Sequence, residues 1–197
     1  MAMQKTNLTE LSVEILAEEF EYIASTASQS NEDRARVSSF YLVAVGSLVA
    51  ALFSTQWFHS SKGTGDLHLL FAGLFLILTL LGTLTVMQLA RLRAAWHESM
   101  SALNQLKEYA IQRDKELAKA FRWRAATMPP LHKFNSISYL QTLEVALLSG
   151  LTFGAAVYFL QAGLGFDRPV CNWGFTLAAS FFAFFFQLFI YKRQLQR

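Results

Sequence analysis

Charged side chains are missing from four long stretches of this sequence. The charge-free stretches run from Val37 to Ser61, from Leu67 to Ala90, from Val145 to Phe166 and from Pro169 to Tyr191. Each is longer than the roughly 20 residues with which an α-helix crosses a hydrocarbon core of about 30 Å. A soluble domain of this length would place charges every few residues to cover its surface. The pattern therefore predicts four transmembrane helices.

The composition agrees with an all-α integral membrane protein that also has a cytoplasmic helical layer. The chain has 197 residues, of which 53% are hydrophobic and only three are proline. The first charge-free stretch follows an acidic segment, not the short basic segment that begins a signal peptide, so we expect it to be retained. The only cysteine, Cys171, excludes an intrachain disulfide and is expected to be a free thiol near a helix end.

The distribution of Lys and Arg predicts the orientation in the membrane. Residues 91–138 carry nine of the seventeen basic residues, and residues 192–197 carry three more. Basic residues stay on the cytoplasmic side, so both termini and the middle segment are expected inside. Interfacial aromatic residues would then be Trp57 and Trp173 on the outer side, with Tyr41 and Tyr191 on the inner side.

The segments between the spans read as helices too. Asn7 and Glu10 have cap spacing, and apolar residues then recur every three to four positions, at Leu8, Leu11, Ile15, Leu16, Phe20 and Ile23. Ser30 with Asp33 predicts the start of a second helix that continues into the first span. Residues 1–37 carry three basic and seven acidic residues, and residues 91–138 carry nine basic and four acidic ones. We expect these oppositely charged segments to pair.

The second span is expected to continue into the cytoplasm as one long helix. A coiled-coil-like seam through Leu92, Trp96, Leu103 and Leu106 follows the last apolar residues. Met128-Pro129-Pro130 ends this region, because proline has no N–H to donate and restricts the residue before it. The predicted parts are cytoplasmic helices in 1–37, spans one and two with a short outer turn in 38–90, a cytoplasmic connector in 91–133, spans three and four in 134–191, and a basic end in 192–197.

Small residues mark candidate helix-packing faces within the spans. They are Ala44, Ser47, Ala51 and Ser54 in the first span, the GxxxG pair Gly150 and Gly154 in the third, and Gly174 and Ala178 in the fourth. Packing within one chain and packing between subunits remain open for each. The six phenylalanines between 181 and 189 point in every direction, so some of them are expected to face lipid.

Glu144 is the one acidic residue inside a predicted span. An ionised carboxylate there is costly, so we expect it to face a partner, water or the inner interface. Candidate partners near the cytoplasmic ends of the spans are Gln187 first and Gln88 next, and Gln141 lies one turn nearer the cytosol. A structural tie between helices or subunits, a pore-lining acid that favours cations and a proton-coupling acid remain open readings.

No recognisable catalytic or cofactor-binding pattern is present. The sequence has no Gly-rich phosphate loop, HExxH, paired CxxC or nucleophile elbow. Its four histidines are scattered without metal-ligand spacing. Phe121-Arg122-Trp123-Arg124 combines basic and aromatic residues, and contact with anionic lipid headgroups explains it better than nucleic-acid binding. We therefore expect no enzyme activity, no cofactor and no bound metal.

Two stretches resemble bacterial membrane protein families. Arg34, Ser38, Phe40 and Tyr41 fill an R-x-x-x-N/S-x-F-F/Y pattern that is similar to the start of the first membrane helix in the RipA-like family of small octameric membrane proteins. Serine stands at 38 where that family usually has asparagine. Trp96, Ser99, Asn104, Lys107, Tyr109, the 121–124 stretch and Pro129 resemble recurring positions of a second, uncharacterised group. The resemblance implies a homo-oligomer with cytoplasmic helices and a central pore, as in some related antiphage membrane proteins.

Three functional hypotheses follow from these patterns. The first is a homo-oligomeric protein of the bacterial inner membrane that forms a pore, with membrane lipids and further copies of itself as partners. The second is a membrane scaffold or regulatory subunit that recruits a cytoplasmic protein. The third is a small proton-coupled transporter in which Glu144 is the coupling acid, although the sequence has no inverted repeat of the kind such transporters contain.

Overall fold

The structure is all-α, as the charge pattern predicts. The computed structural model describes residues 2–54, 64–166 and 169–196. Its elements are α1 (Ala2–Ser54), α2 (Thr64–Arg113), the short α3 (Leu117–Ala120), the 3-10 turn η2 (Ala125–Thr127), α4 (Ile137–Gly163) and α5 (Pro169–Leu195). The four longest helices are each long and apolar enough to cross a membrane. Trp57, His59 and Lys62, in the predicted outer turn, lie outside the described residues.

Helix α1 corrects the prediction of two separate N-terminal helices. It continues without interruption from Ala2 to Ser54. Ser30, the expected cap, instead donates its hydroxyl to the Thr26 carbonyl oxygen at 3.0 Å, and Thr26 does the same to Tyr22 at 2.9 Å. These bonds satisfy the hydroxyls within the helix, and the segment contains no proline to interrupt it.

The chain divides into two compact units. One contains residues 1–33 and 92–133, here called the connector unit, and the other contains residues 34–91 and 134–197, here called the span unit. Both boundaries in the first half of the chain fall inside continuous helices, α1 and α2. The amphipathic and basic segments therefore form one unit, and the four charge-poor segments form the other.

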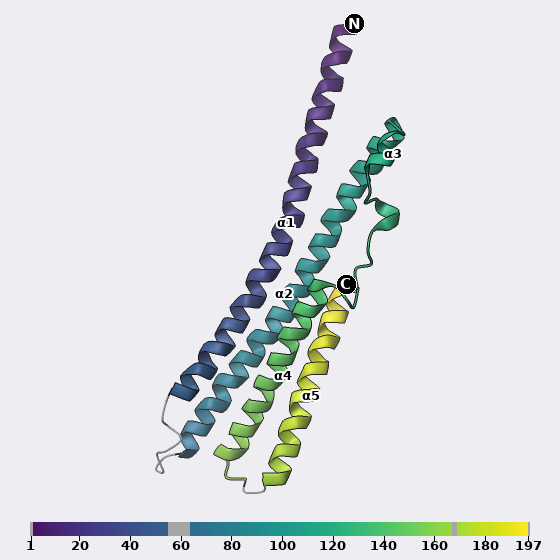
Figure 1. Ribbon diagram of the computed structural model, residues 1–197. Helices are drawn as coiled ribbons and strands as arrows, with labels where there is room; N and C mark the ends of the chain where they lie inside the picture. Colours follow the sequence, from purple (N-terminus) through teal and green to yellow (C-terminus); the bar gives the residue numbers. More distant parts are fainter. Residues whose placement is uncertain (1, 55–63, 167–168, 197) are drawn as a thin grey trace. The chain divides into compact units, whose positions relative to one another are not determined.

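In the span unit, the two C-terminal helices pack along each other. Figure 1 shows α4 and α5 side by side and antiparallel. Gly150 and Gly154 face α5: a Cβ atom at Gly150 would lie 2.8 Å from the Ser180 carbonyl oxygen, and one at Gly154 would lie 3.2 Å from that of Thr176. The small GxxxG side thus lets the two backbones approach closely.

The two tyrosines of the predicted inner aromatic belt do not face outward from the chain. Tyr41 is 1% exposed and Tyr191 is 3% exposed, so neither ring is available to lipid headgroups. Tyr191 instead packs against Tyr139 with ring centroids 6.3 Å apart. Both rings lie in the interior of the span unit because each belongs to the buried stripe of its helix, with Ser38 and Val45 on α1 and with Gln187 and Leu195 on α5.

In the connector unit, the helices bury a narrow apolar side. Helix α1 buries Ile23 and Ala27, and α2 buries Leu103 and Ile111. The predicted α1 stripe is only partly buried, because Ile15 is 55% exposed and Phe20 38% exposed. The side chains of Leu8 and Leu11 lie outside the described part. Of the predicted α2 seam, Leu103 is buried and Leu92, Trp96 and Leu106 are half-buried.

Candidate functional site

The interior of the span unit contains a layer of hydrogen-bonded polar side chains. Gln187 on α5 is 1% exposed, and its Nε2 donates to the Ser149 hydroxyl of α4 and, at 3.4 Å, to the Thr83 hydroxyl of α2. Ser149 in turn donates to the Thr79 carbonyl oxygen at 3.2 Å. These hydrogen bonds therefore join α2, α4 and α5 at one level. In a bilayer, no water would be available to replace them.

A second contact extends this layer along α2 and α4. The hydroxyl oxygens of Thr79 and Thr152 lie 3.0 Å apart, and either can donate. Each hydroxyl also lies close to a backbone carbonyl of its own helix, Thr79 to Phe75 and Thr152 to Ser149, at 2.9 Å in both cases. The serine and threonine hydroxyls of the layer are thus satisfied by the protein itself, whereas the Oε1 atom of Gln187 is buried with no hydrogen-bond partner among the described residues.

Helix α1 joins the same layer through Tyr41. The Tyr41 hydroxyl and the Ser149 side chain occupy the space beside Gly82 on α2, where a Cβ atom would lie 2.7 Å from the Tyr41 hydroxyl oxygen. A side chain at position 82 would collide with both. The glycine is therefore required by the close approach of α1 and α4 to α2.

This polar layer was not identified from the sequence, apart from Gln187. The signal was present: Thr79 and Thr83 are one turn apart in the second apolar stretch, and Ser149 and Thr152 share a side of the third. Hydroxyl residues are common in membrane helices, so spacing alone could not tell which of them face one another. The layer contains no base, nucleophile pair or metal-ligand set, and it is suited to structural tethering.

Glu144 does not lie with this layer, which contradicts its predicted pairing with Gln187 inside one chain. Its side chain lies on the exposed face of α4. It has no hydrogen bond or ion pair with the described residues. The hydrogen bonds of Gln187 run to Ser149 and Thr83. The alternative, that Glu144 faces a neighbouring subunit or water, stays a prediction.

The face around Glu144 is otherwise apolar. Residues three to four positions apart on this face of α4 are each more than half exposed: Ile137, Leu140, Leu147 and Leu151. Helix α4 begins after Ser136, whose hydroxyl accepts a hydrogen bond from the Tyr139 amide at 3.2 Å. Glu144 therefore lies about 10 Å along the helix from Ile137, at a rise of 1.5 Å per residue.

The two other predicted intramembrane amides differ from Gln187. Gln88 is exposed on α2, and Gln141 is half-buried on α4. The Gln141 Oε1 atom is buried and has no hydrogen-bond partner among the described residues. Neither amide is brought to Glu144 by a contact in the described chain.

The small residues predicted to form packing faces in the first and fourth spans are mostly exposed where the structure describes them. Ser47 and Ala51 are exposed on α1, Ala44 is half-buried, and Ser54 has no described side chain. Gly174 and Ala178 are exposed on α5, and a Cβ atom at Gly174 would meet nothing within 4 Å. The partners of Gly150 and Gly154 are instead Thr176, Ser180 and Phe184. The subunit-interface alternative for the exposed small residues stays a prediction.

In the connector unit, an arginine attaches the end of the connector to α2. Arg93 is 5% exposed, donates through Nε to the Leu131 carbonyl oxygen at 3.2 Å and lies 4.5 Å from the centre of the Trp96 ring. A charged group in this position is stabilised by hydrogen bonds to carbonyls and by the ring face. Pro129 and Pro130 thus lie in a segment that returns to the α2 surface.

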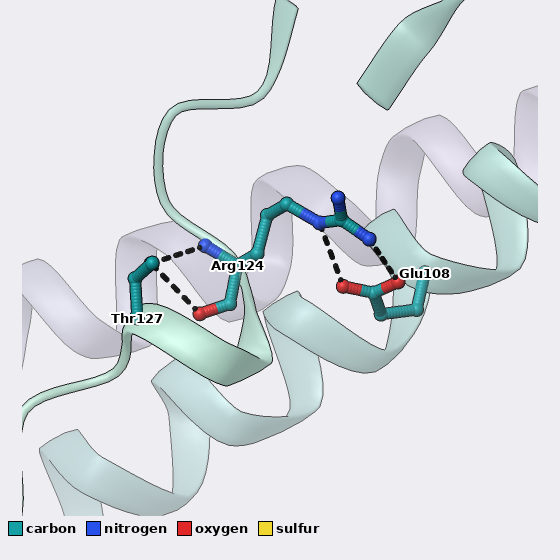
Figure 2. A network of polar contacts seen from close by, with 3 residues as sticks. All are labelled: Glu108, Arg124 and Thr127. Carbon is teal, nitrogen blue, oxygen red and sulfur yellow. Dashed lines mark hydrogen bonds and ion pairs between the residues drawn. The ribbon is translucent and has the colours of Figure 1, made fainter. Parts of the chain in front are cut away.

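The basic-aromatic stretch also folds back on α2. Figure 2 shows Arg124 donating to both carboxylate oxygens of Glu108, through Nε at 3.0 Å and through Nη2 at 2.9 Å. The backbone of Arg124 is held by Thr127, which accepts from its amide at 3.0 Å. The hydrogen bonds to Arg124, followed by its charge, lower the pKa of Glu108 below its ordinary value. One of the two cations that suggested headgroup binding is therefore committed to an internal ion pair.

The rest of that stretch is presented outward in part. Trp123 is 66% exposed and Arg122 is exposed, whereas Phe121 is half-buried near Lys107, whose Nζ lies 5.9 Å from its ring centre. In the family-like pattern of α1, Arg34 and Ser38 are buried while Phe40 is 70% exposed. The matching positions therefore do not share a single face or a single role.

Two cavities accompany these features. One of about 1110 Å³ lies between the C-terminal end of α4 and the N-terminal half of α5, with Gln161 and Asn172 among mostly apolar walls. A smaller one of about 230 Å³ lies in the connector unit among Trp96, Asn104, Trp123 and Met128. No group of three or more potential metal ligands occurs among the described residues, and His68 stacks on Phe159 with centroids 6.0 Å apart.

Comparison with protein-family models, with curated proteins and with solved structures finds no match to this chain.

Proposed function

We propose that this chain forms a homo-oligomeric assembly in the bacterial inner membrane, with a cation pathway between subunits lined by the Glu144 face of α4. The observation that carries the proposal is an exposed carboxylate, with no partner among the described residues of its own chain, on a helix that is apolar enough to span the bilayer. Such a group in hydrocarbon costs a few kcal/mol. Water in a pathway between copies would keep it solvated.

The interior of a single chain is a poor place for such a pathway. The Gln187, Ser149 and Thr79 hydrogen bonds cross the span unit, and Tyr41 and Gly82 are in close contact beside them. A pathway would have to break this layer. The exposed face of α4 has no such obstruction. A ring of acidic side chains around a pore would favour cations.

The orientation in this proposal has both termini and residues 91–133 in the cytoplasm. The support is the positive-inside rule applied to the nine basic residues of 91–138 and the three of 192–197. Glu144 would then lie in the inner half of the bilayer. An octamer is the number that the RipA-like resemblance implies, and counting subunits tests it.

Assembly and conduction can be measured separately. Native mass spectrometry of the detergent-purified chain should show a closed oligomer, and a monomer alone would contradict the proposal. In liposomes, the reconstituted chain should pass cations in preference to anions, with the preference reduced in Glu144→Gln. Glu98→Gln is the matched control, because Glu98 is an exposed acid on the cytoplasmic part of α2. Equal selectivity of both variants would remove Glu144 from the pathway.

A scaffold function is favoured by one specific observation in the connector unit. The half-open cavity beside Trp96 and Met128 has the exposed Trp123 at its edge, and exposed aromatic residues beside a cavity are typical of protein-binding sites. A cytoplasmic protein captured by the native chain but not by Trp123→Ala, together with no flux, would favour this function. The transporter hypothesis is less supported, because α2, α4 and α5 continue unbroken through their apolar segments.

A further inference from the structure

One surface of α1 in the connector unit is both acidic and apolar. Glu14, Glu18 and Glu19 are exposed, and between them Ile15 is 55% exposed and Tyr22 is 67% exposed. None of these carboxylates has a hydrogen bond or an ion pair with the described residues. The expected pairing of the acidic α1 segment with the basic connector of the same chain is therefore absent at these positions. Exposed apolar side chains rimmed by unpaired charge mark an interaction surface.

A groove on the same unit is also apolar, but more basic than acidic side chains line it. It has a volume of about 550 Å³ and lies between α1 and the α2–α3 region, with apolar walls that include Phe20, Leu106 and Phe121. Lys107, Arg113 and Asp114 also line it. Lys115 and Arg122 are exposed nearby in the sequence.

The groove side keeps a positive charge after its internal pairs are counted. Residues 107–124 contain six basic and three acidic residues, a net charge of +3. Glu108 is paired with Arg124, and Glu116 with Lys119. The Asp114 carboxylate accepts the Glu116 amide at 2.9 Å. After these pairs are counted, basic side chains still outnumber acidic ones in this segment, and they would attract an acidic helix.

We propose that the acidic face of α1, defined by Glu14, Ile15, Glu18, Glu19 and Tyr22, docks into the α1–α2–α3 groove of a second copy of this chain. The argument is charge complementarity between two surfaces that the same unit carries, each with exposed apolar groups at its centre. A contact between two different surfaces is heterologous, and a repeated heterologous contact closes into a ring when the rotation permits. The inference rests on the proposed homo-oligomer and names its cytoplasmic interface.

Charge reversal tests the contact in the full-length chain. The double variant Glu18→Lys with Glu19→Lys, and separately Arg113→Glu with Arg122→Glu, should each raise the concentration for half-assembly about tenfold, since two exposed attractions become repulsions. Mixing the two variants should restore assembly, because reversed faces again meet opposite charges. Glu98→Lys is the control and should assemble like the native chain. Mass photometry in detergent provides the readout.

A second measurement does not depend on reversed charges being tolerated. In a Cys171→Ser background, a Glu18→Cys chain mixed with an Arg113→Cys chain should form a crosslink between different chains when a short bismaleimide reagent alkylates both thiols. If the native chain is oligomeric but neither reversal weakens it and no crosslink forms, this interface is wrong while the oligomer stands. If the native chain is a monomer, the proposed function itself fails. Capture of another protein by the acidic face, with assembly unchanged, would also overturn the inference.

Discussion

The two glycines at 150 and 174 should respond in opposite ways to the same substitution. The sequence predicts a packing role for both, yet of the two only Gly150 faces a close neighbour among the described residues. A Cβ atom at Gly150 would lie 2.8 Å from the Ser180 carbonyl oxygen and 3.3 Å from the Phe184 amide nitrogen, both of which are backbone atoms of α5. At Gly174 nothing lies within 4 Å. Gly150→Ala must therefore separate two helix backbones, whereas Gly174→Ala fills open space.

The expected difference can be worked out from these contacts. Replacing a helical glycine by alanine favours the helix by roughly 0.5–1 kcal/mol at either site, so this effect cancels when the two variants are compared. Inserting a methyl group into a close-packed contact costs about 1–3 kcal/mol. Gly150→Ala should thus be about 1–3 kcal/mol less stable than Gly174→Ala, a change of roughly 5- to 150-fold in the folding equilibrium.

Reversible unfolding in mixed micelles measures this difference directly. Both variants, with the native chain, would be titrated with a denaturing detergent and followed by tryptophan fluorescence. Oligomer dissociation must be complete before the unfolding transition, which dilution can establish. Equal stabilities for the two variants would refute the close α4–α5 contact at Gly150, and a larger loss at Gly174 would show that this face is the packed one.

Two further predictions concern polar contacts. Gln187→Leu should lower the stability of the span unit by about 0.6–1.7 kcal/mol in the same titration, since it removes hydrogen bonds to two other helices. Gln88→Leu, at an exposed position, should change the stability by less than about 0.5 kcal/mol. Equal losses for the two variants would contradict the polar layer. Arg124→Ala should lower the hydrogen-exchange protection factors of residues 121–133, measured relative to the intrinsic exchange rate at each pH, and acid should do the same in the native chain. Arg124 lowers the pKa of Glu108 from its ordinary value of 4.5. The contact therefore contributes stability that is present above pH 4.5 and is lost as the pH falls through the lowered pKa. Protection that is unchanged in acid would count against this ion pair.

Much of the fold was accessible from the sequence because charge is excluded from lipid. The positions of the four apolar helices follow from the charge-free stretches, and the all-α class from their length. The N-terminal helix break was wrong because serine and threonine hydroxyls can bond within a helix as well as cap it.

The candidate site was less accessible, since helix rotation is not fixed by hydropathy in a span that is apolar on all sides. Glu144 was expected to meet Gln187, but these side chains point to different surroundings, one outward and one into the bundle. Likewise Gly150 and Gly174 are alike in sequence and differ in contact. Which residues face one another depends on how neighbouring helices pack, and local spacing does not record it.

Thiol labelling along the exposed face of α4 that contains Glu144 tests the central claim most directly. In a Cys171→Ser background, single cysteines would replace Leu140, Glu144 and Leu147, with the exposed Phe189 of α5 as the lipid-facing comparison. A water-soluble, membrane-impermeant thiol reagent applied to the cytoplasmic side of proteoliposomes should modify all three α4 positions and leave position 189 unmodified. If positions 144 and 147 react no faster than position 189, the face of Glu144 lies against lipid and no aqueous pathway passes there.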